Sequence, residues 1–361
     1  MMGERDVLKV SVTLPGIISS GEGGAGLNVR GSGSDQNAFY INRIPVYNTS
    51  HLFGFFSAFN SDIIKDFSIY KGHIPAQYGG RLASVFNITT RQGNRKRFTI
   101  HGGISPITAN AVFEGPVKKD TASFIFSIRS SYSDWILSRL KDTTINKSNA
   151  DFKDFAGGLN WDFKKTQIAI FGYRSSDNFS LSDLSNYSYS NTGASLIIDH
   201  NFSNSLRGEI SLAGSDYAFS TIDKLEKSSS FTHSYELKHY EISTSFRQML
   251  NRNYLEYGGS FILYKLDRGT VVPYGEASLL DNVYLGKEDG IENSLFLSDS
   301  YTIKPGINLT AGLRYTLFSP LGPEKIYHYY PGSPRDAETA PPQGLARPLR
   351  RGPHPARRPG G

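Results

Sequence analysis

Apolar and polar residues alternate along much of the chain, from about Lys96 to Phe318. In the clearest segment, 306–318, every second residue shares one face; the apolar set is Ile307, Leu309, Ala311, Leu313, Tyr315 and Leu317. A period of two predicts a β-strand, and runs of ten or more exceed the ~5–6 residues of an ordinary globular strand. Such lengths are typical of strands that cross a bilayer, which need ~9–11 residues.

Counting these segments predicts roughly 11 long strands. They lie at 97–104, 108–117, 120–130, 154–163, 166–175, 192–201, 205–218, 231–249, 252–267, 290–304 and 306–318. Tight turns at 118–120 and 304–306 alternate with longer polar loops, which we place at 140–150, 176–189 and 267–289. This alternation favours an antiparallel outer-membrane β-barrel over residues 95–330. A soluble β-sandwich with one solvated face remains the alternative.

Residues 1–94 have a different pattern, with short apolar runs separated by glycine and turn residues. Segments 27–30, 38–41 and 44–47 are predicted to be short strands. The segment Asp62–Phe67 is predicted to be a short helix that leads into a strand at 67–71. The expected fold of this region is a small α+β domain.

The composition of the chain is unusual mainly at its C-terminal end, where most of the net positive charge lies. The formal net charge is +6, but residues 334–361 alone carry six Arg against only Asp336 and Glu338. The remainder is close to neutral, so we expect no nucleic-acid partner. Residues 331–361 are rich in Pro and Arg, and from 334 onwards contain no aromatic residue, so this tail is predicted to be disordered.

The sequence lacks the features of disulfide-linked proteins, of proteins with a membrane-spanning helix and of precursors with a signal peptide. It contains no cysteine, no run of ~18 apolar residues, and no apolar signal-peptide core at its start. We therefore expect the N-terminus of an exported precursor to lie outside this sequence.

Three motifs invite a chemical interpretation and are better explained otherwise. Gly21–Gly26 matches G-x-G-x-x-G, but a strand-like segment follows it where a dinucleotide site needs a helix. His233 and His239 lie too far apart to chelate a metal by themselves. The acidic loop 281–290 is more simply a solvated loop than a Ca²⁺ site. We predict no catalytic residue, no metal and no cofactor, and therefore no enzyme.

Several segments, in this order, resemble the plug domain of TonB-dependent receptors as found in Bacteroidetes-type proteins. They are 14–17 (LPGI), 28–31 (NVRG), 35–37 (DQN), 44–48 (IPVYN), 51–57 (HLFGFFS), 70–72 (YKG) and 75–85 (PAQYGGRLASV). Each is weak alone, and their order over some eighty residues makes the match specific. Residues 114–117 and 127–132 also resemble the first barrel strands of that family.

The resemblance implies an α+β plug followed by an antiparallel transmembrane β-barrel, which is incomplete here. A receptor of this kind has about 22 strands, so we expect about half the barrel wall. The TonB box is not found, and we expect this chain by itself neither to close a barrel nor to transport, since unpaired strand edges are not tolerated in lipid.

The implied function is uptake of a scarce nutrient across the outer membrane. The implied partners are the TonB complex, a small-molecule or oligosaccharide ligand of the siderophore, cobalamin or glycan class, and outer-membrane lipid. A passive porin or adhesin with a vestigial plug and a soluble β-rich binding protein are the alternative functions.

Two groups of side chains are candidates for function. His51, Phe53, Phe55 and Phe56 form either a ligand-contact loop or a local core of the plug. Arg30 and Arg81 are predicted to pair with acidic groups of the plug or the barrel wall, with simple surface positions as the alternative.

One position departs from the family pattern. The family commonly has Asp-Gly where this chain has Asn42-Arg43. Since Arg tolerates positive φ less readily than Asn, the turn type stays open.

Overall fold

The computed structural model describes residues 6–19, 26–139, 141–142, 146–182 and 184–322, apart from the side chain of Phe53. The chain divides into two compact units, 1–320 and 321–361. The first is described below, and the predicted tail 331–361 lies outside the described residues.

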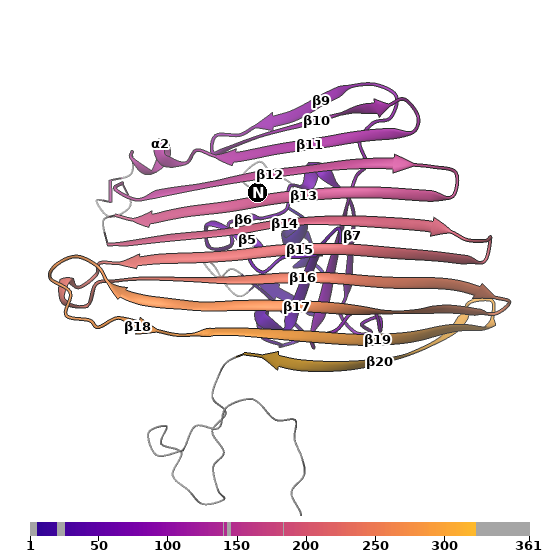
Figure 1. The fold of residues 1–361 in the computed structure, drawn as a ribbon. Coiled ribbons are helices and arrows are strands. Elements are labelled where there is room, and N and C mark those ends of the chain that lie inside the picture. Colours follow the sequence, from indigo (N-terminus) through magenta and orange to yellow (C-terminus); the bar gives the residue numbers. More distant parts are fainter. Residues whose placement is uncertain (1–5, 20–25, 140, 143–145, 183, 323–361) are drawn as a thin grey trace, which may run out of the picture. The chain divides into compact units, whose positions relative to one another are not determined.

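Most of the first unit is one large antiparallel sheet, here called the wall (Figure 1). In chain order its strands are β9 (Thr99–Ile104), β10 (Thr108–Lys118), β11 (Ala122–Ser131), β12 (Asn149–Asp162), β13 (Thr166–Leu181), β14 (Ser185–Asn201), β15 (Leu206–Asp223), β16 (Phe231–Leu250), β17 (Asn253–Pro273), β19 (Lys287–Lys304) and β20 (Ile307–Leu321), with β18 (Val283–Tyr284) on β17. Each strand otherwise pairs with its neighbours in sequence. The predicted series of long antiparallel strands is confirmed.

The ends of several strands correct the predicted loops. Residues 176–189 were expected to be a loop, but β13 and β14 pair until Leu181 faces Ser185. Likewise β17 extends to Pro273 and β19 begins at Lys287, within the expected loop 267–289. The prediction was wrong because polar side chains end the apolar pattern without ending the backbone hydrogen bonds of the ladder.

The connections at the two ends of the wall differ. At one end they are tight, at 119–121, 163–165, 202–205, 251–252 and 305–306. At the other end they include the longer segments 132–148, 224–230 and 274–286, with helix α2 (Asp134–Leu137) in the first of these and the 3₁₀ turn η4 (Lys227–Ser229) in the second. We call this second end the long-loop end.

The two faces of the wall have different character. On β13, Phe171, Tyr173, Ser175 and Asp177 are buried, whereas Ile170 on the opposite face is exposed. Other exposed apolar residues of the outer face include Leu212 on β15, Ile242 on β16, and Leu295 and Leu297 on β19. Buried residues of the inner face include many serines and several charged groups. Within the described residues, no helix is both long and apolar enough to cross a membrane.

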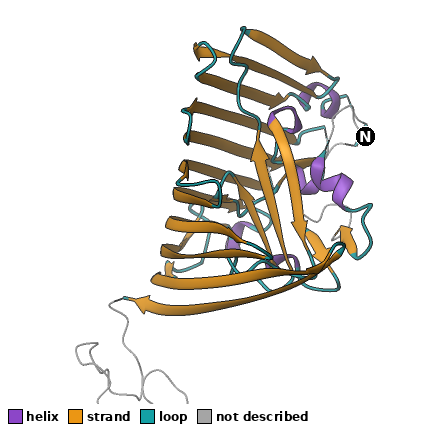
Figure 2. Cartoon of the chain, turned by 90° about the vertical axis from the view of Figure 1, so that its right-hand side faces the viewer, coloured by secondary structure: helices purple, strands orange, loops and turns teal. Residues whose placement is uncertain are grey.

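The segments before β9 form a small lobe against the inner face of the wall (Figure 2), here called the N-terminal lobe (residues 6–94). Its helices and turns are α1 (Val7–Ser11), η1 (Ser34–Gln36), η2 (Leu52–Gly54) and η3 (Ser61–Ile63). Its strands are β1 (Ile17–Ser19), β2 (Leu27–Val29), β3 (Asn37–Ile41), β4 (Ile44–Pro45), β5 (Ser50–His51), β6 (Phe56–Ser57), β7 (Ile64–Tyr70) and β8 (Ser84–Thr90). A mixed sheet of order β4-β3-β8-β7 contains one parallel pair, β3 with β8.

The helix predicted at 62–67 is absent, and that prediction was wrong. A single 3₁₀ turn ends at Ile63, and β7 begins at Ile64 and pairs with β8. The Asn60 side chain accepts the backbone N–H of Asp62, which favours a turn, and the following residues extend because the edge of β8 offers a full ladder of partners.

The core of the lobe is shared with the wall. Phe39 and Phe86 stack with ring centroids 4.4 Å apart, and Ile44 and Ile88 are fully buried beside them. The same cluster includes side chains of β10, β11 and β13, namely Val112, Ile125, Phe171 and Tyr173. Apolar packing thus joins the lobe to the wall.

One glycine of the wall is required by a close approach between strands. Gly269 has φ +78°, and a Cβ there would lie 1.6 Å from the carbonyl oxygen of Ser234, beside an irregularity in the pairing of β16 and β17. Gly275 has φ +77° with open space around it.

We predict that Gly269→Ala lowers the apparent unfolding temperature clearly more than Gly275→Ala, which carries only the ~1–2 kcal/mol strain of positive φ. Thermal unfolding in detergent, followed by circular dichroism of the β-structure, measures both, and equal shifts would contradict the prediction.

Candidate functional site

Charged side chains also join the N-terminal lobe to the wall, in three groups and in the pair of Arg91 with Glu114 of β10. Each group links a residue or backbone carbonyl of the lobe to inward-facing side chains of the wall. They lie around His51, around Arg43 and around Arg314.

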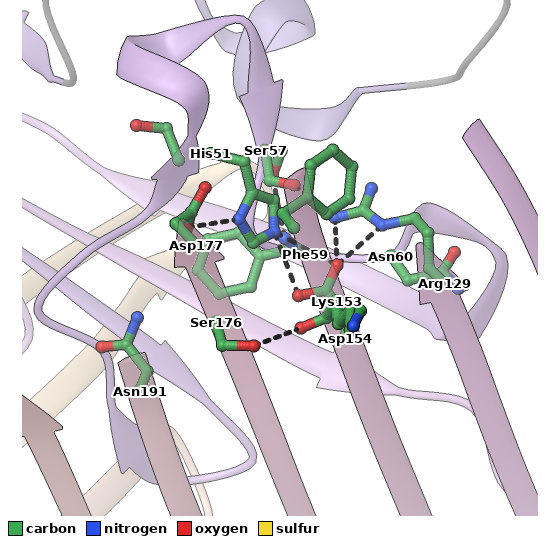
Figure 3. A network of polar contacts seen from close by, with 12 residues as sticks. His51, Ser57, Phe59, Asn60, Arg129, Lys153, Asp154, Ser176, Asp177 and Asn191 are labelled. Atoms are coloured by element: carbon green, nitrogen blue, oxygen red, sulfur yellow. Dashed lines mark hydrogen bonds and ion pairs between the residues drawn. The ribbon is translucent and has the colours of Figure 1, made fainter. Parts of the chain in front are cut away.

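The first group surrounds His51 at the end of β5 (Figure 3). Its ring is completely buried, with Nδ1 2.7 Å from Asp177 Oδ2 and Nε2 3.0 Å from Asp154 Oδ1. Asp154 and Asp177 come from the neighbouring strands β12 and β13. The free oxygen of Asp177 accepts the backbone N–H of Leu52 at 3.1 Å. One turn of the lobe therefore contacts two wall strands.

Arg129 of β11 completes this group. Its guanidinium donates to Asp154 Oδ2 at 2.8 Å through Nε and to the Ser57 carbonyl at 2.6 Å. Phe152 of β12 stacks on the His51 ring at 4.1 Å, nearly parallel, and Arg129 lies over the same phenyl ring. The two carboxylates thus face two cations in a site closed by an aromatic ring.

This arrangement sets the protonation of His51. Burial acts to lower the pKa of His51, but the negative charge of Asp154 and hydrogen bonds to Asp154 and Asp177 outweigh it and raise the pKa to about 9. Both ring nitrogens face carboxylate oxygens, which only accept hydrogen bonds. The ring is therefore an imidazolium at neutral pH.

The same hairpin is held on its other side by helix α1. The Asp6 side chain caps α1 at Leu8 and Lys9 and also accepts the backbone N–H of Ser57 at 3.2 Å. Lys9 Nζ donates to the Phe55 carbonyl. The hairpin β5–β6 is therefore placed between α1 and the wall.

The second group surrounds Arg43, in the turn between β3 and β4. Asn42 and Arg43 both have positive φ, 46° and 71°, which is the pattern of a type I′ hairpin and resolves the turn type. Arg43 contacts Glu209 of β15, with Nη2 2.5 Å and Nε 2.8 Å from Oε1. Glu209 also pairs with Arg247 at 3.5 Å, which in turn binds Glu256. The ion pair with Glu209 offsets the strain of a non-glycine residue at this turn.

The third group surrounds Arg314 of β20. Its guanidinium donates to the Gln77 carbonyl of the lobe at 2.9 Å and to Ser294 Oγ of β19 at 2.7 Å, and it pairs with Glu292 at 3.4 Å. A Cβ at Gly79 would lie 2.5 Å from Arg314 Nε. The absence of a side chain at Gly79 therefore lets the lobe approach this arginine.

A cavity of about 570 Å³ lies between the lobe and the wall. The lobe contributes Tyr40, Tyr47 and Arg81, among others, and the wall contributes His239, Tyr264, Glu292 and Phe318. Tyr47 Oη lies 3.1 Å from His239 Nδ1, whose Nε2 contacts Glu241. The volume of the cavity falls in the ~300–1,000 Å³ range of small-molecule sites. The described residues contain no cluster of His, Asp or Glu able to hold a metal ion.

The predicted residues 51–56 point in different directions. His51 and Phe56 are buried, and the Phe56 ring packs against Phe152 at 5.3 Å. Phe55 is 48% exposed, and the side chain of Phe53 lies outside the described residues. The structure places His51 and Phe56 toward the wall, and a ligand contact of this segment stays a prediction.

Arg30 and Arg81 occupy other positions than the charged groups above. The Arg30 guanidinium lies over Gly72 of the lobe, and Arg81 donates to the Gly80 carbonyl and borders the cavity. Among the described residues, neither forms an ion pair. Within the described residues, ion pairs from the lobe to the wall are made instead by His51, Arg43 and Arg91.

The wall residues of these contacts were missed from sequence, although a signal existed. Charged residues on the inward-facing side of six of the long strands are Arg129, Asp154, Asp177, Glu209, Glu256 and Glu292. A charge at a buried position of a strand implies a partner across the interface. The partner itself, such as His51 for Asp177, is 126 residues away and cannot be read from spacing.

The Arg43–Glu209 contact can be measured by a double-mutant cycle. Arg43→Gly keeps a residue suited to positive φ and removes the side chain that contacts Glu209, and Glu209→Gln removes the charge of its partner. We predict a coupling of ~1–3 kcal/mol in the free energy of unfolding. The matched variants Arg268→Gly and Glu288→Gln, of an exposed ion pair, should couple by less than ~1 kcal/mol. Additive effects at Arg43 and Glu209 would contradict the prediction.

Comparison with known proteins adds to this geometry. Residues 2–86 match the family model of the TonB-dependent Receptor Plug Domain. No curated protein matches the sequence.

Solved structures of similar fold include a mutant of the ferric enterobactin receptor from Pseudomonas aeruginosa (15% identity, TM-score 0.62). They also include the ferric preacinetobactin receptor from Acinetobacter baumannii (12%, 0.64) and the FrpB iron transporter from Neisseria meningitidis (13%, 0.63). The alignments cover 87%, 88% and 87% of this chain and 55%, 56% and 55% of those chains, respectively. This chain therefore spans about half the length of those receptors.

The N-terminal lobe, which holds the matched segment, rests on the inner face of a wall whose fold corresponds to that of these receptors. The chain thus matches the TonB-dependent receptor plug domain over residues 2–86, and its wall has the fold of part of the β-barrel of the similar receptors.

Proposed function

We propose that this chain belongs to an outer-membrane receptor that takes up a small-molecule nutrient through TonB-dependent rearrangement of its plug. The observation that carries the proposal is the pairing of the plug with the wall through buried charges. In each group a wall residue that contacts the plug also has a partner within the wall.

Because of this double pairing, Asp177 is the wall charge of the three groups that loses its counter-ion on release, within the described residues. When the plug leaves, Asp154 keeps Arg129, Glu209 keeps Arg247, and Arg314 keeps Glu292. Leaving a buried charge unpaired costs ~3–5 kcal/mol, and the wall partners avoid much of that cost. The contacts therefore fix the docked plug while keeping its displacement within reach of an external pull.

The hairpin β5–β6 supports a route for such a pull. It is bound to α1 through Asp6 and Lys9 and to the wall through His51. We propose that force applied to the N-terminal side of the plug by the TonB complex reaches the wall contacts through this hairpin.

For the ligand we propose the siderophore class, with cobalamin and glycans as the other nutrient classes. The support is that two of the similar structures are receptors for ferric enterobactin and ferric preacinetobactin. The cavity offers phenol groups from Tyr40, Tyr47 and Tyr264 beside Arg81. We propose no covalent step: the protein binds, changes conformation and releases.

The outer face of the wall supports the proposed location. Exposed apolar residues on β13, β15, β16 and β19 face away from the plug, as contact with lipid requires. We propose that these strands span the outer membrane, with the long-loop end outside the cell.

The function is tested by iron-limited growth on a panel of ferric siderophores, in cells whose only siderophore receptor contains this chain. We expect growth on at least one siderophore, and its loss when TonB is deleted, because plug displacement needs the external pull. Growth that survives without TonB would identify a passive porin. Absence from the outer-membrane fraction, with gel migration that does not depend on heating, would identify a soluble protein.

A further inference from the structure

We infer that release of the plug from the wall is coupled to loss of one proton, which leaves His51 as its hairpin departs from Asp154 and Asp177. This inference concerns regulation of the plug contact and rests on the proposed function only for its biological meaning. The contact itself is a property of the fold.

The geometry requires a proton on each nitrogen of His51 while the plug is docked. Nδ1 faces Asp177 and Nε2 faces Asp154, and neither carboxylate can donate when ionised. Neutral imidazole has only one N–H, so one of the two contacts would become a repulsive approach of lone pairs. The docked state therefore selects the imidazolium.

The released state does not require a protonated His51. The hairpin leaves the stacked ring of Phe152 and both carboxylates, and a histidine in water has an ordinary pKa near 6.5. The docked pKa of about 9 is higher, because both carboxylates stabilise the cation. Docking is therefore fully favoured below about pH 6.5 and weakens as pH rises toward about 9.

The neighbouring groups do not cancel this effect. Those that face His51 or its two carboxylates are Arg129 on β11, Tyr173 on β13, Tyr189 on β14 and Tyr217 on β15, with Asp6 and Lys9 on the α1 side of the hairpin. Carboxylates, Lys, Arg and Tyr in water change charge below about pH 5 or above about pH 9. Between those limits, His51 is the group of this cluster that exchanges a proton on release.

The magnitude follows from proton linkage. One proton lost on release makes the release equilibrium rise ~10-fold per pH unit between the two pKa values. Removing the imidazole removes this slope. It also weakens docking at neutral pH, because Asp177 loses its cationic partner while Asp154 keeps Arg129.

The chain has no cysteine, so a single introduced thiol can report release. Ser50 is buried in the same hairpin, one residue before His51, and Ser228 is exposed in the loop between β15 and β16. Maleimide labelling rates of Ser50→Cys and Ser228→Cys are measured from pH 6.5 to 9.5 on the full chain folded in detergent. Their ratio cancels the pH dependence of the thiol itself and reports the release equilibrium.

We expect this ratio to rise about tenfold per pH unit between about pH 7 and pH 9 and then to level off. In His51→Gln it should be higher at pH 7 and independent of pH. The control His233→Gln, on β16 and outside the cluster, should keep the slope of the parent.

A flat profile of the parent chain would overturn the inference, and it needs no His51 variant to fold. An unchanged slope in His51→Gln would also overturn it. Neither measurement involves TonB or a ligand. TonB-independent growth would therefore remove the proposed function and leave the proton linkage standing, whereas a flat profile would do the reverse.

Discussion

The buried imidazolium of His51, between two carboxylates on adjacent strands, is the interaction on which the docking of the plug most depends. It joins the hairpin β5–β6 to β12 and β13, while Arg129 ties the same hairpin to β11. An apolar contact of equal area would hold the plug without regard to direction or register. Charged hydrogen bonds have a fixed geometry, so they define one docked position and are lost together when the hairpin moves.

The wall is built so that losing these bonds costs little on its own side. Its inner face carries Arg129 beside Asp154, Arg247 between Glu209 and Glu256, and Arg314 beside Glu292. Within the described residues of the three groups, each wall charge that contacts the plug, except Asp177, has a counter-ion within the wall. Asp177 has its cation from the plug, so the His51 group changes most in the proposed release.

The fold was predicted from sequence because it follows local rules. Period-two alternation located the strands β9 to β20, apart from the two-residue β18. It could do so because successive side chains of a strand point to opposite faces, so burial of one face appears directly in the sequence. Strand ends were misplaced at 176–189 because backbone pairing continues where apolar side chains stop. The helix expected at 62–67 was wrong because the edge of β8, more than twenty residues later, supplies partners that local propensity cannot show.

The charged contacts could be predicted only in part, for the same physical reason. The alternation along their strands shows that Asp154, Asp177 and Glu209 face inward and need partners. Which residue reaches each carboxylate depends on the tertiary fold and not on the local sequence. Arg43 illustrates the difference. As a turn residue it looks unfavourable, since positive φ suits Asn or Gly. Its guanidinium contact with Glu209, 166 residues away, explains its presence, so the residue that is unfavourable for the turn marks a contact between the lobe and the wall.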